Sequence, residues 1–277
     1  MKILLLSPNG MLGTAWKRLL EAKGIDHTAI GRPNLDLTRP ASIDAVMSSG
    51  YSHIINCAAW TDVDAAEEHE HAATVINGAA VRLLAEHAAE INAQLVHYST
   101  DYVFNGQATS PYPIDAPHDP VNAYGRSKAA GEKAIRQSRA SYLVIRTSWV
   151  YAPWGNNFVQ TMRKLTADRD ELKVVADQRG RPTSAEHLAM ASLELMEKNA
   201  EGFLHVCDGG ECTWHELASH VAESTGSGCV VQPCTTSEFP RPAKRPSYSV
   251  LDLKPSEDLI GPMPDWRDNV DRVLSHS

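Results

Sequence analysis

Apolar runs and amphipathic stretches alternate along residues 1–150. A continuous apolar run, typical of a strand buried on both faces of a parallel sheet, occurs at residues 2–6, and further strands are predicted at residues 52–59 and 93–98. Two further strands are predicted at residues 26–30 and 142–146. Helices are predicted in the intervals, at residues 14–20, 41–48, 65–91 and from residue 124 onward. These strand–helix alternations predict an α/β fold with a Rossmann-type, doubly wound parallel sheet.

The pattern changes after residue 150. A helix is predicted from about residue 158, a strand at 171–175 and an amphipathic helix at 185–199. Thr213 and Glu216 form a capping-box motif that opens a further helix. We therefore predict two domains. The sheet domain covers residues 1–150, with a return segment around 171–200, and a smaller C-terminal α/β domain covers most of 151–277.

Composition indicates an ordinary globular chain. It has 277 residues, of which 43% are hydrophobic and 22% charged, and a formal net charge of −8, which argues against a nucleic-acid or anionic-membrane partner. No apolar run approaches the ~18 residues of a membrane span, so we expect no membrane association and a cytoplasmic location. The five cysteines are odd in number and lack the spacing of a zinc knuckle, so we expect buried free thiols and no metal site.

The strand at residues 2–6 runs into a glycine-containing turn and then a helix. This is the context of a dinucleotide-binding loop, in which backbone N–H groups at the helix N-terminus face a pyrophosphate. Gly10, Met11, Leu12 and Gly13 form the turn, whereas Ser7 occupies the first glycine position of a G-x-x-G-x-x-G pattern. Because glycine also ends strands and lets helices pack closely, a purely structural role stays open.

Arg32 follows the second predicted strand, where NAD-preferring sites carry an acidic residue. A guanidinium suits a 2′-phosphate, so Arg32 favours NADP(H), with NADH as an alternative cofactor and a solvated loop arginine as the competing interpretation. Further basic residues in loops of the C-terminal part would suit a diphosphate-bearing substrate, and scattered surface charge is the alternative. They are Arg179, Arg181, Arg241, Lys244 and Arg245.

Tyr124 and Lys128 are four residues apart in a predicted helix, so their side chains share one face. A free tyrosine has a pKa near ~10, and a neighbouring ammonium favours the phenolate and lowers that pKa toward neutrality. We expect Thr100, at the end of the fourth strand, to hold the oxygen on which the tyrosine acts. The three side chains would then polarise a carbonyl group. A chance Y-x-x-x-K spacing on a helix is the alternative.

The carboxyl ends of parallel strands gather at one edge of a doubly wound sheet, where ligands bind. Five small or hydroxyl residues follow predicted strands, so we expect them at one site: Gly10, Ala58, Ala59, Thr100 and Thr147. The loop at residues 105–122 is rich in proline and polar residues, and we expect it to cover this site.

With these residues in view, the chain resembles the extended short-chain dehydrogenase/reductases over essentially all of its 277 residues. Within that family it is similar to the subgroup that reduces nucleotide-linked 4-keto sugars. The runs at residues 99–104 and 146–151 are fairly specific to this subgroup, whereas the Tyr124/Lys128 pair belongs to the whole family. The remaining similarity lies at residues 10–13, 56–64, 181–183 and 245–252.

The resemblance implies NADPH-dependent reduction of the C4 keto group of dTDP-4-dehydrorhamnose to dTDP-L-rhamnose, a precursor of cell-surface polysaccharide. It implies that Tyr124 protonates the oxygen, that Lys128 lowers the pKa of the phenol and binds the nicotinamide ribose, and that Thr100 hydrogen-bonds the carbonyl. Together with the loop residues above, the predicted cofactor site comprises Gly10, Met11, Leu12, Gly13, Arg32, Asp36, Leu37, Ala58, Ala59, Trp60, Tyr98, Tyr124 and Lys128. The predicted substrate site comprises Val63, Thr100, Asp101, Trp149, Arg181 and Arg245.

Two other functions stay open. A nucleotide-sugar epimerase or dehydratase shares the resemblance, but the dehydratases carry Asp-Glu after the threonine, whereas Asp101 is followed by Tyr102 here. The second alternative is a non-catalytic NADP-binding subunit that resembles the partner of methionine adenosyltransferase, against which the intact Thr100, Tyr124 and Lys128 argue. A homodimer is an open alternative to a monomer.

Overall fold

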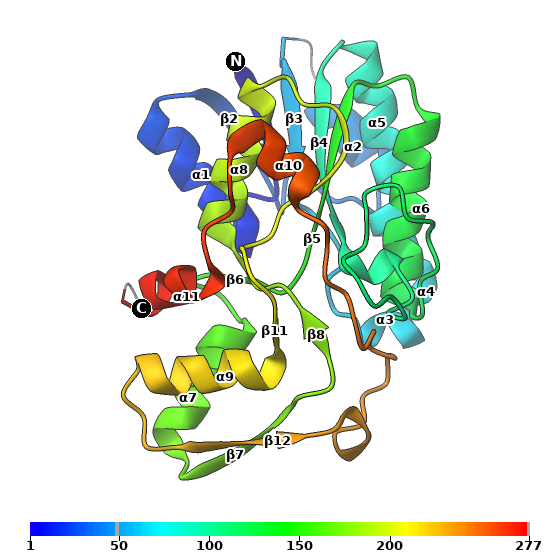
Figure 1. The fold of residues 1–277 in the computed structure, drawn as a ribbon. Coiled ribbons are helices and arrows are strands. Elements are labelled where there is room, and N and C mark those ends of the chain that lie inside the picture. Colours follow the sequence, from blue (N-terminus) through cyan, green and yellow to red (C-terminus); the bar gives the residue numbers. More distant parts are fainter. Residues whose placement is uncertain (48–49, 276–277) are drawn as a thin grey trace.

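Six parallel strands form the centre of the molecule, in the order β10-β5-β4-β3-β1-β2 (Figure 1). The computed structural model describes residues 1–47 and 50–275. The strands are β1 (Lys2–Leu6), β2 (Asp26–Ile30), β3 (His53–Asn56), β4 (Gln94–Thr100), β5 (Tyr142–Thr147) and β10 (Gly202–His205). The strand order reverses between β1 and β3, which is the switch point at which doubly wound sheets bind ligands. The predicted Rossmann-type sheet is confirmed.

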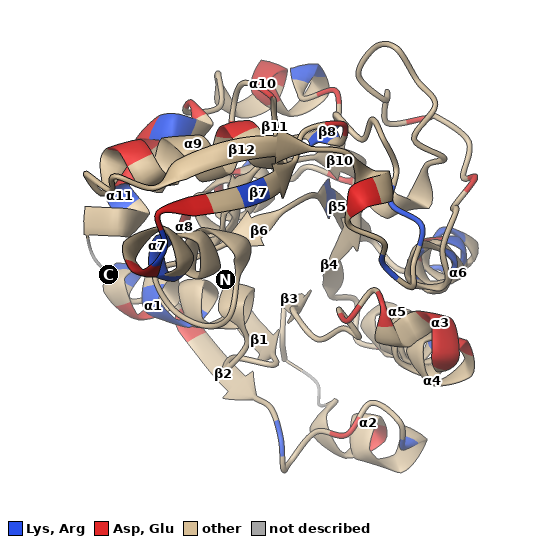
Figure 2. Ribbon diagram, turned by 90° about the horizontal axis from the view of Figure 1, so that it is seen from below, with Lys and Arg blue, Asp and Glu red and all other residues tan. Residues whose placement is uncertain are grey.

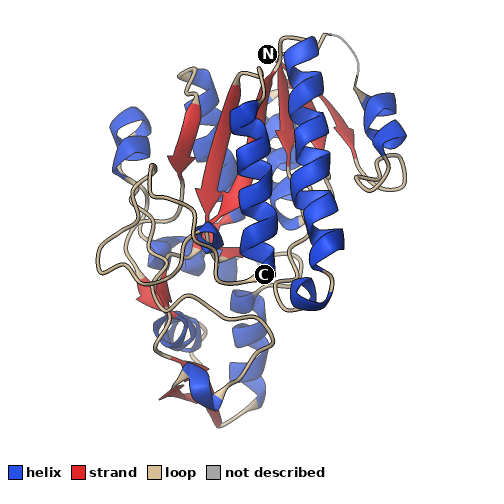
Figure 3. Cartoon of the chain, turned by 90° about the vertical axis from the view of Figure 1, so that its right-hand side faces the viewer, coloured by secondary structure: helices blue, strands red, loops and turns tan. Residues whose placement is uncertain are grey.

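Helices cover both faces of this sheet (Figure 3). On one face lie α1 (Met11–Lys23) and α8 (Ala185–Glu197), and on the other lie α2 (Pro40–Val46), α5 (Ala80–Glu90) and α6 (Ala123–Gln137). Ile3 and Leu5 of β1 point into the first layer, whereas Leu4 and Leu6 point into the second, and all four are fully buried. The continuous apolar run therefore belongs to a strand that is buried on both faces. Burial of each such side chain contributes about 1.5–3 kcal/mol to the stability of the fold.

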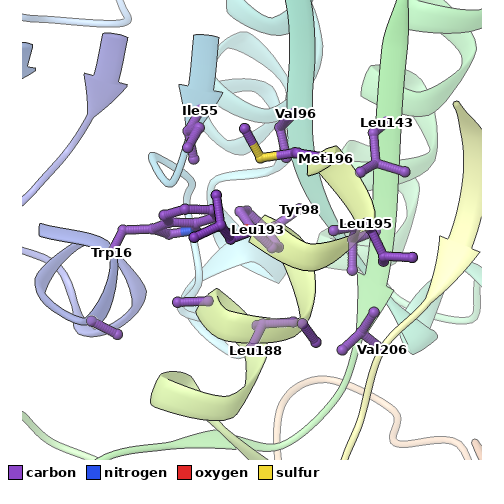
Figure 4. Close-up of a cluster of buried hydrophobic side chains, with 14 of the residues drawn as sticks. Trp16, Ile55, Val96, Tyr98, Leu143, Leu188, Leu193, Leu195, Met196 and Val206 are labelled. Atoms are coloured by element: carbon purple, nitrogen blue, oxygen red, sulfur yellow. Dashed lines mark hydrogen bonds between the residues drawn. The ribbon is translucent and has the colours of Figure 1, made fainter. Parts of the chain in front are cut away.

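The layer between the sheet and helices α1 and α8 is built around Trp16 (Figure 4). Trp16 Nε1 donates to Tyr98 Oη at 2.7 Å, and Tyr98 Oη donates to Ser192 Oγ at 2.9 Å. Both rings are buried with their polar atoms paired, so they add apolar contact area without an unsatisfied donor. These contacts fix β4, which ends at Thr100, relative to α1 and α8.

The prediction of a single helix over residues 65–91 is wrong. The chain forms α3 (Ala65–Glu68), α4 (Glu70–Thr74), a π-helical turn (Val75–Ala79) and α5. The backbone leaves helical geometry at His69, and the π turn presents Asn77 to the main chain of Trp60, which it contacts through both amide atoms at 2.9 and 3.0 Å. This tertiary contact outweighs the regular helical pattern. Of the helix predicted at 41–48, Ser48 lies outside the described residues.

A smaller lobe lies below the sheet in Figure 1. It contains α7 (Phe158–Asp168), β7 (Glu171–Val175), α9 (Trp214–Ser224), β12 (Val230–Cys234) and α11 (Trp266–Ser275). β7 and β12 pair in parallel, and a separate apolar cluster around Trp266 joins them to the three helices. The capping box of Thr213 and Glu216 is confirmed, with both hydrogen bonds present. The fold class, a large sheet with a smaller C-terminal α/β part, is therefore as predicted.

The chain returns to the large sheet after residue 150. α8, β10 and the short helix α10 (Lys254–Ile260) lie there, and β10 forms its outer strand beside β5. Two short two-stranded ladders form along the segments that run between the lobes, β6 (Val150–Tyr151) with β9 (Thr183–Ser184) and β8 (Arg179–Gly180) with β11 (Cys212–Thr213). The division of the chain at residue 150 stays a prediction. Within the described residues no helix combines the length and apolar character needed to cross a bilayer.

Gly13 allows α1 to pack against the end of β1. A Cβ atom there would lie 2.0 Å from the Ser7 carbonyl oxygen, whereas a Cβ on Gly10 would lie 3.7 Å from the same atom. We expect Gly13→Ala to lower the free energy of unfolding by about 1–3 kcal/mol, because the helix must move away. The matched variant Gly10→Ala should change it by less than about 0.5 kcal/mol. Urea unfolding of both proteins measures this, and equal losses would contradict it.

Candidate active site

A cavity of about 940 Å³ lies between the carboxyl ends of the large sheet and the smaller lobe. One wall comes from the segments that follow β1, β3, β4 and β5, together with α6. The opposite wall comes from α7, β7, α9 and the loop after β12. Its size falls within the range of small-molecule sites, and it lies where doubly wound sheets bind ligands. Figure 2 views this side of the molecule and shows acidic and basic positions interspersed along the ribbon.

The cavity brings together most of the residues predicted from the sequence. Those that line it are Gly10, Met11, Leu12, Ala59, Val63, Tyr98, Thr100, Asp101, Tyr124, Lys128, Trp149 and Arg245. Seven predicted residues do not line it: Gly13, Arg32, Asp36, Leu37, Ala58, Trp60 and Arg181. The convergence of strand ends expected from the sequence is thus present, although not every candidate reaches the cavity surface.

The residues outside the lining have other contacts. The Arg181 guanidinium donates to the carbonyl oxygens of Leu251 and Gly210, at 3.0 and 2.5 Å. Asp36 accepts hydrogen bonds from Thr38, which lower the pKa of its carboxyl group. The loop at residues 105–122 does not line the cavity either. Its Tyr112 pairs with the backbone of residues 250–252, so the expectation that this loop covers the site is wrong.

The turn after β1 has free backbone donors. Gly10 is the N-cap of α1 and supplies no side chain to the first helical turn, so the N–H groups of Met11 and Leu12 have no capping partner. Ser7 adopts φ of +62°, the left-handed conformation that glycine favours, in the position where the sequence pattern expects a glycine. The backbone therefore keeps the shape of a dinucleotide loop despite the serine. A helix N-terminus of this kind attracts a phosphate group.

Tyr124 and Thr100 meet at the sheet edge, beside Asp101. Burial raises the pKa of Tyr124, the Asp101 carboxylate raises it further, and hydrogen bonding to Thr100 acts in the opposite direction. The Thr100 hydroxyl donates to Asp101 Oδ1 at 2.9 Å. The phenol is therefore held in its protonated form, which is the form that can donate a proton to a substrate oxygen.

Lys128 does not lower the pKa of Tyr124 in this structure, which corrects the sequence expectation. Its Nζ donates to the Tyr98 carbonyl oxygen at 2.6 Å and lies 3.3 Å from His97 Nε2. The side chain is almost completely buried, and burial lowers the pKa of Lys128 to about 8, although the Glu132 carboxylate acts in the opposite direction. Burial thus disfavours the ammonium form of Lys128 that the sequence expectation assumed, and its Nζ points toward β4.

A buried polar network lies behind these side chains. Glu132 and Arg146 form an ion pair at 2.7 Å, and both side chains are fully inaccessible to solvent. Ser99 Oγ donates to Glu132 Oε1 at 2.5 Å, and His118 Nε2 lies 2.7 Å from Oε2. Burial alone would raise the pKa of Glu132, but the hydrogen bonds of His118 and Arg146 lower it to about 2. Glu132 is therefore a carboxylate that anchors α6 to β4 and β5.

The opposite end of the cavity carries aromatic and cationic groups. Trp149 stacks on Trp214 with ring centroids 3.6 Å apart. Arg241 and Arg245 both contact the Asp64 carboxylate, at 2.9 and 3.0 Å. A second guanidinium nitrogen of Arg245, Nη1, is buried and has no hydrogen-bond partner among the residues that the structure describes. An unpaired buried donor beside a cavity is suited to an anionic ligand.

Several site residues were missed in the sequence. Trp214 directly follows the N-cap Thr213, and the capping-box pattern predicts the helix start but does not mark the ring as part of a ligand site. Asn56 and His97 lie close to Lys128 in the folded protein. The sequence does not predict this proximity, because the register of β3 and β4 brings the two side chains together. All five cysteines are free thiols, four of them buried and Cys57 partly so. Within residues 1–47 and 50–275, no three His, Cys, Asp or Glu side chains gather into a metal site.

Comparison with known proteins gives consistent matches. The family model described as RmlD substrate binding domain matches residues 1–277. The chain is 38% identical to a dTDP-4-dehydrorhamnose reductase of Burkholderia thailandensis, over 96% of each chain. It is 40% identical to a probable dTDP-4,6-dihydroxy-2-methyloxan-3-one 4-ketoreductase of Streptomyces antibioticus, over 96% of this chain and 92% of that protein. Among solved structures, the dTDP-4-dehydrorhamnose reductase of Bacillus anthracis in complex with NADP superposes with a TM-score of 0.93, at 34% identity and complete coverage of both chains.

Asp101 should make folding stability depend on pH. Its pKa is raised from 3.8 to about 6, mainly by burial, so the folded state favours the protonated acid. Stability is therefore greatest below the unfolded value and is lost as pH rises through the folded value. We expect Asp101→Asn to gain stability relative to the unchanged protein between pH 4 and pH 7, by up to about 3 kcal/mol from roughly two pKa units.

Urea unfolding at several pH values measures this difference. The variant Asp26→Asn, at an exposed position of β2, controls for the loss of one negative charge. Parallel pH dependences of Asp101→Asn and the unchanged protein would contradict the argument.

Proposed function

The chain belongs to the family described as RmlD substrate binding domain, and from this premise we propose that it reduces the C4 keto group of dTDP-4-dehydrorhamnose, giving dTDP-L-rhamnose with NADPH as the reductant. The observation that carries the proposal is the meeting of Tyr124, Thr100 and Lys128 at one end of a cavity whose other end has cationic and aromatic groups. A candidate proton donor and groups suited to a nucleotide sugar thus line one cavity. The product would serve synthesis of cell-surface polysaccharide.

The residues at the sheet edge fit a dinucleotide cofactor. The uncapped N–H groups of Met11 and Leu12 suit its pyrophosphate, and the small Ala59 leaves room for a flat ring beside the backbone. Arg32, Asp36 and Leu37 follow β2, where the adenosine ribose lies in dinucleotide-binding folds, so we keep them as candidates although they do not line the cavity. When bound, NADPH supplies the hydride, and the chain supplies the proton and the orientation.

Tyr124 is the group that donates this proton in the proposed reaction. Its raised pKa keeps the phenol protonated, and Thr100 lies within hydrogen-bonding range of it, so a keto oxygen placed between the two residues accepts from the phenol, and from Thr100 once that hydroxyl turns away from Asp101. Lys128 lines the same cavity four residues further along α6, and in the proposed reaction its ammonium group turns from β4 toward the phenolate that remains. Without a substrate, the Thr100 hydroxyl donates to Asp101 Oδ1 at 2.9 Å.

The sugar nucleotide fits the other end of the cavity. Arg245, with its unpaired Nη1, and Arg241 suit the diphosphate, whereas the paired Trp149 and Trp214 rings offer an apolar surface to the sugar or the base. Arg181 is a weaker candidate because its guanidinium is engaged by backbone carbonyl oxygens. Val63 lies on the same cavity wall as Tyr124 and completes the proposed contact surface.

The alternatives have less support. An elimination reaction of the dehydratase kind needs a further acid–base residue directly after Asp101, and that position holds Tyr102, whose pKa is raised by burial. A regulatory subunit would not need the Tyr124–Thr100 contact. We expect the protein to act in the cytoplasm, and a homodimer stays a proposal.

Tyr124→Phe should lower kcat by about 10²–10⁴-fold, because the variant has no proton to donate. NADPH affinity should be retained, since the ring remains. NADPH oxidation with dTDP-4-dehydrorhamnose measures turnover, and fluorescence titration measures NADPH binding. Tyr102→Phe is the matched control: it removes the neighbouring phenol of the same cavity, whose ring centroid lies 6.0 Å away. Undiminished turnover in Tyr124→Phe would contradict the mechanism, and no turnover by the unchanged protein would favour the regulatory alternative.

Arg245→Met should raise the KM for the dTDP-sugar about 10- to 100-fold, because a charge-assisted hydrogen bond contributes roughly 1.5–3 kcal/mol. The KM for NADPH should not change. Arg181→Met separates the two candidate arginines and should leave the KM for the sugar nucleotide within about threefold. The reverse ranking in steady-state kinetics would place the diphosphate at Arg181.

A further inference from the structure

Asn56 and His97 lie beneath the site, on adjacent strands. They are register partners in β3 and β4, and both side chains are buried. Asn56 Nδ2 lies 3.1 Å from His97 Nδ1, and His97 Nε2 lies 3.3 Å from Lys128 Nζ. Three polar side chains thus form a continuous line from β3 through β4 to α6.

The backbone determines the direction of the hydrogen bonds in this line. The Ala58 N–H donates to Asn56 Oδ1 at 3.0 Å. Since a backbone N–H can only donate, Oδ1 is the acceptor and the amide NH₂ faces His97 Nδ1. An NH₂ group can only donate as well, so Nδ1 accepts and carries no proton. A neutral imidazole with a bare Nδ1 has its proton on Nε2.

His97 is neutral, because burial of the ring holds its pKa well below the usual range. Its Nε2–H therefore points at Lys128 Nζ. An ammonium group has only donors, so it would face the imidazole donor to donor at 3.3 Å. A neutral amine has a lone pair that accepts from Nε2–H, while one of its own N–H groups donates to the Tyr98 carbonyl oxygen at 2.6 Å.

We propose that Asn56 imposes the Nε2–H tautomer on His97, and that His97 thereby disfavours the ammonium form of Lys128 in the ligand-free protein. His97 and Asn56 are then positioning residues that act through Lys128, an inference that rests on the proposed function only for its effect on turnover. A ligand that draws Nζ away from His97 removes the opposing donor and lets Lys128 take up a proton. The ammonium form of Lys128, which would stabilise a phenolate at Tyr124, would thus be favoured when a ligand fills the site.

The other groups around Lys128 do not remove this conflict. On α6 the titratable neighbours are Tyr124 and Glu132, with Arg146 of β5 paired to Glu132. Burial lowers the pKa of Lys128, and the Glu132 carboxylate opposes that effect only in part. On β4 the titratable neighbour is His97 itself. The direction of one hydrogen bond therefore decides whether the amine or the ammonium is favoured.

Nitrogen-15 NMR of the ligand-free protein, labelled at histidine and lysine side chains, tests the tautomer directly. We expect a pyrrole-type signal for His97 Nε2 and a pyridine-type signal for Nδ1, with His97 assigned through its backbone. The opposite tautomer would overturn the proposal. This measurement needs neither turnover nor a variant, so its outcome is independent of whether the protein reduces a keto-sugar.

Two variants test the effect on Lys128. In His97→Gln the amide oxygen can face the ammonium with no added charge, and in Asn56→Asp the carboxylate can accept from both Ala58 N–H and an Nδ1–H imidazole, which reverses the tautomer. Both should raise the pH at which Lys128 loses its proton by about one unit, a tenfold change in its protonation equilibrium. The Lys128 side-chain NMR titration of ligand-free protein and the upper limb of the kcat–pH profile measure this shift.

The comparison between the variants makes the test specific. A shift in Asn56→Asp alone would show that the added carboxylate charge is the cause, and a shift in His97→Gln alone would show that Asn56 does not set the tautomer. Either result, or no shift in both, overturns the proposal. His205→Gln is the matched control, because it removes another buried imidazole, one that contacts Arg146 instead of Lys128, and should produce no shift. Should the variants not fold, the tautomer of the unchanged protein decides.

Discussion

The ion pair between Glu132 of α6 and Arg146 of β5 is the interaction on which the rest of the site depends. Placing two charges in a dry layer costs several kcal/mol per ion, and the cost is offset only when every remaining donor and acceptor is paired. Ser99, His118 and the Ile114 carbonyl oxygen supply these partners. Removing one member would leave an isolated buried charge, which costs about 3–5 kcal/mol. The pair therefore admits one arrangement of α6 against β4 and β5.

That arrangement determines where the reactive side chains lie. Tyr124, Lys128 and Glu132 are spaced four residues apart along α6, so they share one face of the helix. Anchoring Glu132 to Ser99 brings this face onto the end of β4, and Tyr124 then reaches Thr100. The position of the phenol is thus a consequence of packing two turns away. A loosely held helix would leave the phenol and the hydroxyl without a fixed separation.

The two walls of the cavity have different chemical roles in the proposed reaction. The strand ends of the large sheet provide uncapped N–H groups and the proton donor, and they are rigid because the strands are buried on both faces. The smaller lobe provides Trp214 and, through the loop after β12, Arg241 and Arg245. Asp64 joins the walls, since it lies after β3 and pairs with both arginines. An anionic ligand would compete with Asp64 for these guanidinium groups, which couples binding to the contact between the lobes.

The sequence by itself determined the sheet, because runs such as Leu4–Leu6 are apolar at every position and only a strand with two covered faces buries them all. It also predicted the candidate reactive residues, since Thr100 was expected at a strand end and Tyr124 and Lys128 on one helical face. Only the tertiary structure decided the break of the helix at His69, the separation of Arg245 from Arg181 and the packing of loop 105–122 away from the cavity, because these depend on contacts between segments far apart in the chain. The protonation states of Tyr124 and Lys128 also depend on contacts between segments far apart in the chain. Helical spacing alone suggested an ammonium beside a phenol, whereas burial, Asp101 and His97 set the charges, and those effects exist only once the strands and helices have packed together.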